Sequence, residues 1–306
     1  MYNQGFAANA AQLLQMSIKA YVLESPLNSL KQIDGSPIFE EPLVGFADGD
    51  DPLFQEYKTI IGEFHLTPRE ILERYLRDKD GAEVRPPGNI SVISFVLPLA
   101  KTARLSNRKM TAGPSLGWNN ARWHGETLAE ALSEHVVAML REQGFQAVIP
   151  ETLQFFEVRD LPDGRCSNWS QRHAAYAAGL GTFSLNDALI TPKGIAHWCC
   201  SVVTDLKLPP TPRKYANRLA NCPFFVDGSC GACIERCPAG AISAQGHDKV
   251  KCREELFGAQ EAFLSKPGYL GRYAGCGLCL TRVPCETRIP ARALKETSRP
   301  QDPAAR

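Results

Sequence analysis

The sequence lacks any apolar stretch that is long enough to span a membrane, which argues against an integral membrane protein. It also lacks a secretory start, because residues 1–20 have no basic segment followed by a continuous apolar run. The formal net charge is only +1, so composition gives no electrostatic support for a nucleic-acid partner. No internal repeat is visible outside the cysteine runs described below. These absences predict a cytoplasmic protein with no membrane association.

The length and apolar content predict a folded chain of two domains. The chain has 306 residues, of which 44% are hydrophobic. Helical and strand patterns alternate before residue 207, which indicates an α/β domain. The proline-rich stretch Leu208-Pro-Pro-Thr-Pro212 is typical of a linker.

Several segments of the first domain predict defined elements. Thr67-Pro68-Arg69-Glu70 combines an N-cap, a first-turn proline and a capping-box glutamate, so a helix should run from there to about residue 78. The other predicted helices cover residues 8–23, 125–142 and 168–178, and the predicted strands cover residues 90–97, 145–149, 153–158 and 197–206. The aromatic stretch from Trp118 to Trp123 is interpreted as a lid or partner surface, with ordinary packing as the alternative.

Eight of the eleven cysteines fall between residues 222 and 285, and they are the strongest chemical signal in the chain. One run reads Cys230-Gly-Ala-Cys233-Ile-Glu-Arg-Cys237-Pro, and a second reads Cys276-Gly-Leu-Cys279. Cysteines at C-x2-C spacing, a ligand followed by proline and a total of eight thiols are typical of two [4Fe–4S] clusters. Disulfides are disfavoured without an oxidising compartment. Two structural zinc sites remain the alternative, since zinc also accepts four thiolates.

The spacing suggests how two clusters would share the ligands. In two-cluster ferredoxins the last cysteine of the first run ligates the other cluster. Asp227 stands where the usual run has its first cysteine, so either the more distant Cys222 or the aspartate itself completes the run, and soft thiolate is the better iron ligand. The predicted sets are Cys222, Cys230, Cys233 and Cys285, and Cys237, Cys252, Cys276 and Cys279.

A second informative segment is Ala178-Gly179-Leu180-Gly181, which follows a predicted helix. Two glycines permit close approach of the backbone to a flat ligand or a phosphate. A helix C-cap without a ligand is the favoured explanation of the glycines when the segment is taken alone. The segment is not a dinucleotide fingerprint, because it follows a helix and has no third glycine.

Together, the glycine segment and the order of the cysteines resemble the epoxyqueuosine reductase family, relatives of the reductive dehalogenases. The resemblance implies a nitroreductase-like α/β domain that binds cobalamin (residues 1–207), a linker (208–215), a ferredoxin-like domain with two [4Fe–4S] clusters (216–292) and a tail (293–306). It also implies cofactor contacts at Gly179, Leu180, Gly181, Thr182, Phe183, Gly194 and His197.

The chain departs from the family pattern at the proton donor and around the last cysteine. Where the family has an aspartate donor, this chain has Arg165-Cys166, so the candidate catalytic residues are Asp163, Cys166 and Asp160. Cys166 precedes a predicted helix N-terminus, where its pKa would fall; a small buried thiol is the alternative. The family places a proline after its final ligand, whereas here Pro284 precedes Cys285 and Glu286 follows it.

The resemblance implies a reductase that passes single electrons from the clusters to a corrinoid, which then reduces a small or nucleoside-type substrate. An external ferredoxin or flavodoxin would supply the electrons, and tRNA would be a partner only by the resemblance. Two alternatives stay open at this point. One is an electron-transfer or corrinoid-activating protein with no substrate chemistry of its own, and the other is an enzyme with flavin in place of the corrinoid.

Overall fold

The computed structural model describes residues 4–81, 86–162 and 164–297. The chain divides into two compact units, each built from three segments. The first unit comprises Met1–Thr102, Asn120–Leu180 and Trp198–Arg213, and the second comprises Ala103–Asn119, Gly181–His197 and Lys214–Arg306. Both contain helices and strands, so the expected α/β class is confirmed. None of the helices in the described ranges is long and apolar enough to cross a bilayer.

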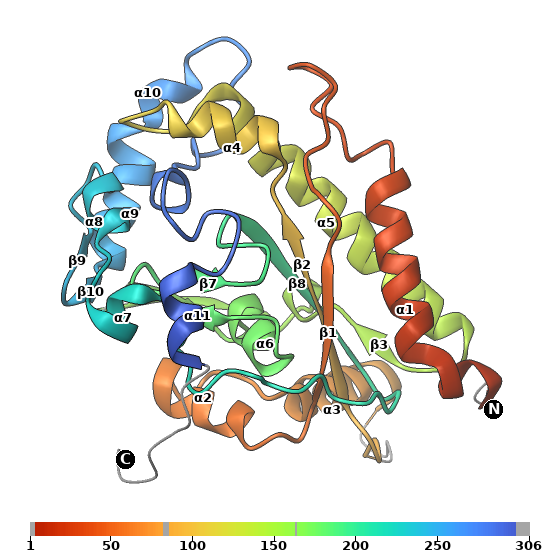
Figure 1. Ribbon diagram of the computed structural model, residues 1–306. Helices are drawn as coiled ribbons and strands as arrows, with labels where there is room; N and C mark the ends of the chain where they lie inside the picture. Colours follow the sequence, from red (N-terminus) through yellow and green to blue (C-terminus); the bar gives the residue numbers. More distant parts are fainter. Residues whose placement is uncertain (1–3, 82–85, 163, 298–306) are drawn as a thin grey trace, which may run out of the picture. The chain divides into compact units, whose positions relative to one another are not determined.

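The first unit is organised around a four-stranded sheet with the order β1-β2-β8-β3 (Figure 1). Its strands are β1 (Leu43–Asp48), β2 (Ser91–Pro98), β8 (His197–Thr204) and β3 (Ala147–Val148). β1 pairs antiparallel with β2, and β3 pairs antiparallel with β8. Every residue of β2 is buried, which agrees with the continuous apolar run that predicted this strand.

Helices α1 (Gln4–Glu24) and α3 (Pro68–Asp80) form where the sequence predicted them. α1 buries one stripe of side chains at helical spacing: Phe6, Ala10, Leu14, Ile18 and Val22. In α3 the hydroxyl of Thr67 accepts a hydrogen bond from the Glu70 N–H, and the Glu70 carboxylate accepts one from the Thr67 N–H. The predicted capping box is therefore confirmed.

Helix α5 (Leu116–Glu142) begins nine residues before the predicted start at residue 125. The hydroxyl of Ser115 accepts a hydrogen bond from the Trp118 N–H, which satisfies one free donor of the first turn. The stretch from Trp118 to Trp123 is thus helical, and its interpretation as a lid or partner surface stays a prediction. Trp118 is 5% exposed and packs as a core residue.

Three other expectations for the first unit need correction. The strand expected at residues 145–149 is reduced to β3, and residues 153–158 form no strand before β4 (Val158–Leu161) begins at the last of them. β4 pairs with β5 (Gly164–Ser167) in a hairpin that the sequence did not predict. The helix expected at residues 168–178 is the shorter α6 (Gln171–Ala177), because Ser170 caps its first turn.

The proline-rich stretch after β8 lies along the outer side of β1. The Thr211 N–H donates to the Phe46 carbonyl at 2.8 Å, and the Phe46 N–H donates to the Thr211 hydroxyl at 2.9 Å. Leu208 is 3% exposed, and its N–H donates to the hydroxyl of Ser91. This segment is anchored to the sheet edge, whereas its composition alone is typical of a free linker.

The second unit is made of short elements joined by turns. These are α4 (Lys101–Arg108, whose first two residues belong to the first unit), β6 (Thr182–Phe183), β7 (Leu189–Ile190), α7 (Pro223–Asp227), α8 (Ala232–Arg236), β9 (Ile242–Ser243), β10 (Gly246–His247), α9 (Lys249–Glu254), η2 (Glu255–Ala259), α10 (Glu261–Leu264), η3 (Leu278–Leu280) and α11 (Ala291–Thr297). Its core includes a small cluster of Leu185, Ile190, Ile195, Cys222, Ile242 and Val283. The tail expected from residue 293 is helical to residue 297, and its remainder lies outside the described residues.

Candidate metal centre

Helices α7 and α8 position the first three cysteines of the predicted cluster module. Cys222 is the N-cap of α7, and Pro223 starts that helix. The helix ends at Gly228, whose φ of 70° turns the chain back toward Cys230. Asp227, the alternative ligand, is exposed, and its carboxylate accepts a hydrogen bond from the Ser229 N–H at 2.9 Å. The carboxylate of Asp227 therefore stabilises this turn through a hydrogen bond to a neighbouring residue.

Four thiols of the first predicted set lie close together. Burial raises the pKa of Cys233 to about 12, with further contributions from Cys222 and Cys230. Burial also raises the pKa of Cys285, again with contributions from Cys222, Cys233 and Cys230. Because the repulsion between thiolates falls with distance, these shifts place the four sulfurs as neighbours.

The second predicted set behaves in the same way. The pKa of Cys252 is raised to about 11, mainly by burial and further by the nearby Cys276 and Cys237. Burial raises the pKa of Cys279, and the neighbouring thiols raise it further; these are Cys276, Cys252, Cys233 and Cys237. The structure thus brings together the residues that the sequence assigned to one cluster, and their role as ligands stays a prediction.

Helix α8 connects the two sets. Cys233 lies in its first turn and Cys237 is its C-cap. One short helix therefore carries a thiol of each set at its two ends. The influence of Cys233 on Cys279 also shows that the two sets are adjacent. Adjacent clusters could exchange electrons without a further carrier.

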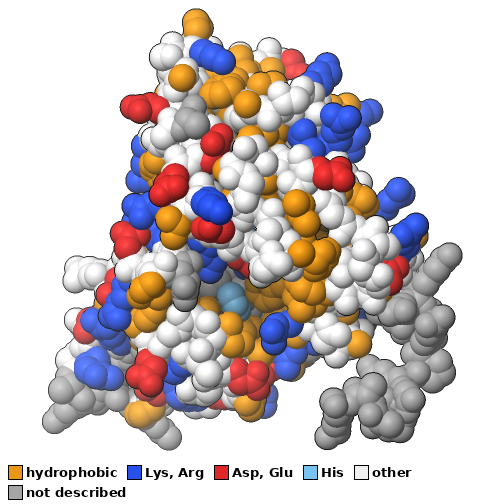
Figure 2. Space-filling model, turned by 90° about the vertical axis from the view of Figure 1, so that its left-hand side faces the viewer, with side chains coloured by type: hydrophobic (Ala, Val, Ile, Leu, Met, Phe, Trp, Pro, Cys, Tyr) orange, Lys and Arg blue, Asp and Glu red, His pale blue; other side chains and the backbone are white. Residues whose placement is uncertain are grey.

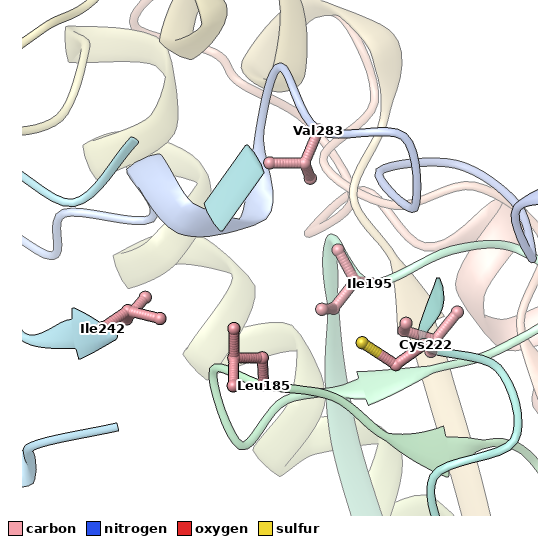
Figure 3. Close-up of a cluster of buried hydrophobic side chains, with 6 residues drawn as sticks. Leu185, Ile195, Cys222, Ile242 and Val283 are labelled. Atoms are coloured by element: carbon pink, nitrogen blue, oxygen red, sulfur yellow. The ribbon is translucent and has the colours of Figure 1, made fainter. Parts of the chain in front are cut away.

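The thiols of the first set line one cavity. It is small, with about 20 Å³ of water-sized space, and its wall includes Cys222, Cys230, Cys233 and Cys285. Cys222 is 6% exposed and belongs to the apolar cluster of this unit. In Figure 3 its sulfur points toward the side chains of Ile195 and Leu185. An apolar surround excludes water from a bound cluster, which is one of the factors that set its reduction potential.

The donor set is the feature that bears on the kind of metal group. All eight cysteines of the two sets are unbridged thiols. Thiolates are the ligands of [4Fe–4S] clusters, and four thiolates also suit one zinc ion. The residues present therefore fit two clusters, and the choice between clusters and zinc stays a prediction.

Backbone N–H groups are directed at some of these sulfurs. The Ala241 N–H donates to the sulfur of Cys237 at 3.3 Å. Burial raises the pKa of Cys222, and hydrogen bonds from the backbone of Leu185, Phe224 and Phe225 oppose that rise. Such donors stabilise thiolate and increase the reduction potential of a cluster.

A buried carboxylate lies directly after the last cysteine. Glu286 is 2% exposed, and it accepts hydrogen bonds from Arg104 at 3.3 Å, from Arg108 at 2.7 Å and from the Arg282 N–H at 2.7 Å. Two guanidinium groups compensate the desolvation of this carboxylate. The sequence marked Glu286 only as a departure from the family pattern, and its arginine partners lie more than 170 residues away.

Arg236 is a further residue that the sequence did not single out. Its guanidinium donates to the carbonyls of Met110, Thr281 and Leu278. Burial lowers its pKa, and nearby Arg282 lowers it further, whereas Cys276 and Cys279 raise it. Arg236 thus ties α8 to the segment of the second set and places a positive charge beside two of its thiols.

The residues expected to contact a corrinoid make internal contacts instead. Gly179 has a φ of 72° and caps α6, and a Cβ there would lie 2.8 Å from the Pro212 carbonyl. A Cβ at Gly181 would lie 2.5 Å from the Ile190 carbonyl. Leu180 packs against Gly45, a close approach that the sequence did not reveal. These glycines are explained by packing, which was the alternative interpretation.

The other expected cofactor residues also have partners within the second unit. The buried Thr182 hydroxyl accepts a hydrogen bond from the Asn221 N–H at 2.9 Å, and the Phe183 N–H donates to the Arg218 carbonyl. The His197 ring Nε2 lies 2.7 Å from the Leu189 carbonyl. These contacts hold the segment in place, and the role of its residues in binding a cofactor stays a prediction.

Gly194 is required by the approach of the chain that carries the last cysteine. The Ile195 N–H donates to the Cys285 carbonyl at 2.8 Å, and the Ala196 N–H donates to the Glu286 carbonyl at 3.3 Å. Gly194 has a φ of 87°, and a Cβ there would collide with the backbone of Glu286. Pairing of these two segments brings Cys285 to the first set.

The candidate proton donors lie on the β4–β5 hairpin or outside the described residues. Asp160 is exposed on β4 and pairs across the hairpin with Arg165. Cys166 lies on β5, five residues before α6, and therefore not directly before the helix as the sequence predicted. Asp163 lies outside the described residues.

Glu151 is an acid of the first unit that the sequence analysis missed. Desolvation of the carboxyl raises its pKa, although the residue as a whole is exposed. The Gln171 amide donates to it and opposes this rise. Gln171 is oriented in turn, because Trp169 donates to Ser201 at 3.0 Å and Ser201 donates to Gln171 at 2.6 Å. The indole N–H of Trp169 can only donate, so the donor and the acceptor of each hydrogen bond in this series are determined.

Comparisons with known proteins agree with the resemblance. No protein-family model matches the chain. The epoxyqueuosine reductase of Bacillus anthracis is 30% identical over 156 residues, which cover 49% of this chain and 38% of the relative. The Bacillus cereus protein of that name is 29% identical over 65% of this chain and 48% of its own. A tetrachloroethene reductive dehalogenase of Desulfitobacterium hafniense is 37% identical over 94 residues, or 30% of this chain and 16% of the relative.

This chain is similar to epoxyqueuosine reductases over part of its length. It spans about half or less of the length of these curated relatives. Among solved structures, a variant of a catabolic reductive dehalogenase aligns with a TM-score of 0.50 at 14% identity, covering 94% of this chain and 38% of that one. This likeness shows a shared fold. An epoxyqueuosine reductase structure aligns over 94% of this chain and 71% of that chain, with 18% identity and a TM-score of 0.45.

The first prediction concerns Gly194 of this epoxyqueuosine reductase-like chain. Gly194→Ala combines the strain of a positive φ, roughly 1–2 kcal/mol, with a collision against the backbone of Glu286. We expect loss of about half of the bound iron and a lower unfolding temperature, measured by iron analysis and circular dichroism under anaerobic conditions. Gly35→Ala is the matched control, since Gly35 has a φ of 73° and open space around it. Equal iron loading in both variants would contradict the role of Gly194.

The second prediction concerns the carboxyl of Glu151. Its pKa lies above the ordinary value of 4.5, and Gln171→Leu should raise it further, because that change removes the hydrogen bond that lowers it. Infrared difference spectra recorded against pH, with the band assigned by Glu151→Gln, measure the shift. Thr152→Ala serves as the control, since that hydroxyl donates to the Ile149 carbonyl. If Glu151 of the unsubstituted protein titrates at or below 4.5, its pKa is not raised and the prediction is wrong.

Proposed function

We propose that this chain is an iron–sulfur reductase in which two [4Fe–4S] clusters deliver single electrons to an acceptor bound by the α/β unit. The observation that carries this proposal is the separation of eight thiols into two adjacent sets of four, joined by α8. The relatives are epoxyqueuosine reductases and reductive dehalogenases, and both names describe reductions. In this proposal the first unit is nitroreductase-like and the second is ferredoxin-like.

The protein supplies the ligands and the surroundings of the clusters. Cys222, Cys230, Cys233 and Cys285 would hold one cluster, and Cys237, Cys252, Cys276 and Cys279 the other. A bound cluster supplies one-electron transfer at low potential. The N–H groups directed at Cys222 and Cys237 and the guanidinium of Arg236 would offset the negative charge of the thiolates.

The proposed acceptor is a corrinoid, the cofactor of this group of reductases. Since the residues expected to touch it are held by internal contacts, we derive no step through a corrinoid from them. Flavin in the same unit is the alternative acceptor. A binding experiment decides between the two.

A reductase of this type also needs a proton. Glu151 is the described acid whose environment favours the protonated form, and the chain from Trp169 through Ser201 to Gln171 holds its carboxyl in place. Asp160 and Cys166 on the hairpin, and Asp163 outside the described residues, remain candidates from the sequence. We propose Glu151 as the proton donor ahead of these three.

An electron-transfer or corrinoid-activating protein with no substrate chemistry is the second candidate function. The observation that favours it is the arginine, Arg165, where the family has its aspartate donor. A nucleoside-type substrate, tRNA included, is supported only by the name of the epoxyqueuosine reductases. On the face shown in Figure 2, basic and acidic side chains are interspersed, and no broad basic area of the kind that binds nucleic acid is visible.

Iron analysis tests the two clusters. Anaerobically reconstituted protein should hold about eight iron and eight sulfide ions per chain. Cys233→Ser and Cys252→Ser should each lose about half of this content, because each removes a ligand of one set. Cys199→Ala, a change outside both sets, should retain all of it. Zinc in place of iron, or loss of all iron in either single variant, would overturn the assignment.

Corrinoid binding tests the acceptor. The reconstituted protein is mixed with hydroxocobalamin and a low-potential reductant, freed of unbound cofactor by gel filtration and examined by visible and EPR spectroscopy. We expect one retained corrinoid per chain with a base-off cobalt(II) signal. Intact clusters without a retained corrinoid would favour the electron-transfer function, and retained flavin would favour the flavin alternative.

A further inference from the structure

A groove opens on the surface of the second unit beside Cys230. Its open volume is about 670 Å³, and it is lined by Pro223, Ser229, Cys230, Pro284, Arg288, Pro290, Ala291 and Arg292. Among the described residues, Cys230 is the only cysteine of either set that lines it. Through Cys230, the first set of thiols therefore reaches the protein surface in this groove.

The groove and the inner cavity share a wall. Pro223, Cys230, Pro284 and Pro290 line both. The rings of three prolines are rigid and apolar, and they leave little between a molecule in the groove and a cluster held by Cys230. Electron transfer between proteins requires such a short separation. The shared wall is the geometric basis of the inference.

The charged side chains that line the groove are all positive. Arg288 and Arg292 are exposed and line it, and no acidic side chain does so among the described residues. Asp227 is close to Arg292, which contributes to lowering the pKa of that carboxyl, so part of one positive charge is offset at the rim. Glu286, the nearest acid along the chain, is buried and paired with Arg104 and Arg108.

The two helices that contribute to the groove each carry one exposed apolar side chain outside its lining. Phe225 on α7 is 44% exposed and Leu294 on α11 is 50% exposed. α7 and α11 pack against each other, and each contributes residues to the lining. A rigid apolar floor with exposed apolar side chains and a basic rim is typical of transient docking sites for redox proteins.

We propose that this groove is the docking site of a small acidic electron-carrier protein, through which electrons reach the cluster of Cys222, Cys230, Cys233 and Cys285. The inference rests on the proposed function, because it requires a cluster in that set. In each encounter the reduced carrier loses one electron and the cluster gains one, with no bond made or broken. Arg288 and Arg292 attract the acidic face of the carrier, and the proline wall receives its redox group.

The test measures reduction of the reconstituted full chain by two acidic carriers, a flavodoxin hydroquinone and a reduced plant-type ferredoxin, in an anaerobic stopped-flow instrument. Arg288→Glu/Arg292→Glu should lower the bimolecular rate constant at low ionic strength by at least tenfold with the carrier that fits. The difference should shrink at high salt, since screening removes steering between exposed charges. Fluorescence titration of the same carrier should show a matching loss of affinity.

The matched control is Lys31→Glu/Arg77→Glu, which makes the same change in net charge on exposed residues of the first unit. It should leave the rate constant within about twofold of the unsubstituted protein. Iron content and reduction by dithionite should be equal in all three proteins. If clusters load and accept electrons from dithionite but both double variants react equally with both carriers, the docking site is wrong. If no clusters load, the proposed function itself fails.

Discussion

The backbone pairing of Gly194–Ala196 with Cys285 and Glu286 is the contact on which the second unit depends. Cys285 lies 48 residues beyond the cysteine run that ends at Cys237, and nothing local holds it near Cys222. Two backbone hydrogen bonds and the close approach at Gly194 place it there. Without that pairing, the first set would have three thiols.

The charges around Glu286 reinforce the same contact. A carboxylate that is 2% exposed requires compensation, and Arg104 and Arg108 supply it from α4. The helix is thereby attached to the residue that follows the last cysteine. Arg236 does the same for α8 through carbonyls of the second set's segment. Arginine side chains thus connect elements that are too short to form a large apolar core of their own.

Local signals predicted the elements well where they were strong. The capping box of α3, the continuous apolar run of β2 and the stripe of α1 all formed, because each depends on neighbouring residues. The start of α5 was missed, since Gly117 and the aromatic residues that follow it are weak helix formers and the cap at Ser115 had no distinct signal. The hairpin of β4 and β5 was missed because its pairing, and not its composition, defines it.

The sequence by itself predicted the metal chemistry, because thiols at C-x2-C spacing bring most of their own geometry with them. It also separated the eight cysteines into the two sets that the structure groups. Only the tertiary structure decided which glycines serve packing, which acid has a raised pKa and where the surface comes close to a cluster. Gly181, Glu151 and the groove at Cys230 acquire these properties from partners far away in the chain. Contacts of that kind depend on how the elements pack, and no local pattern carries that information.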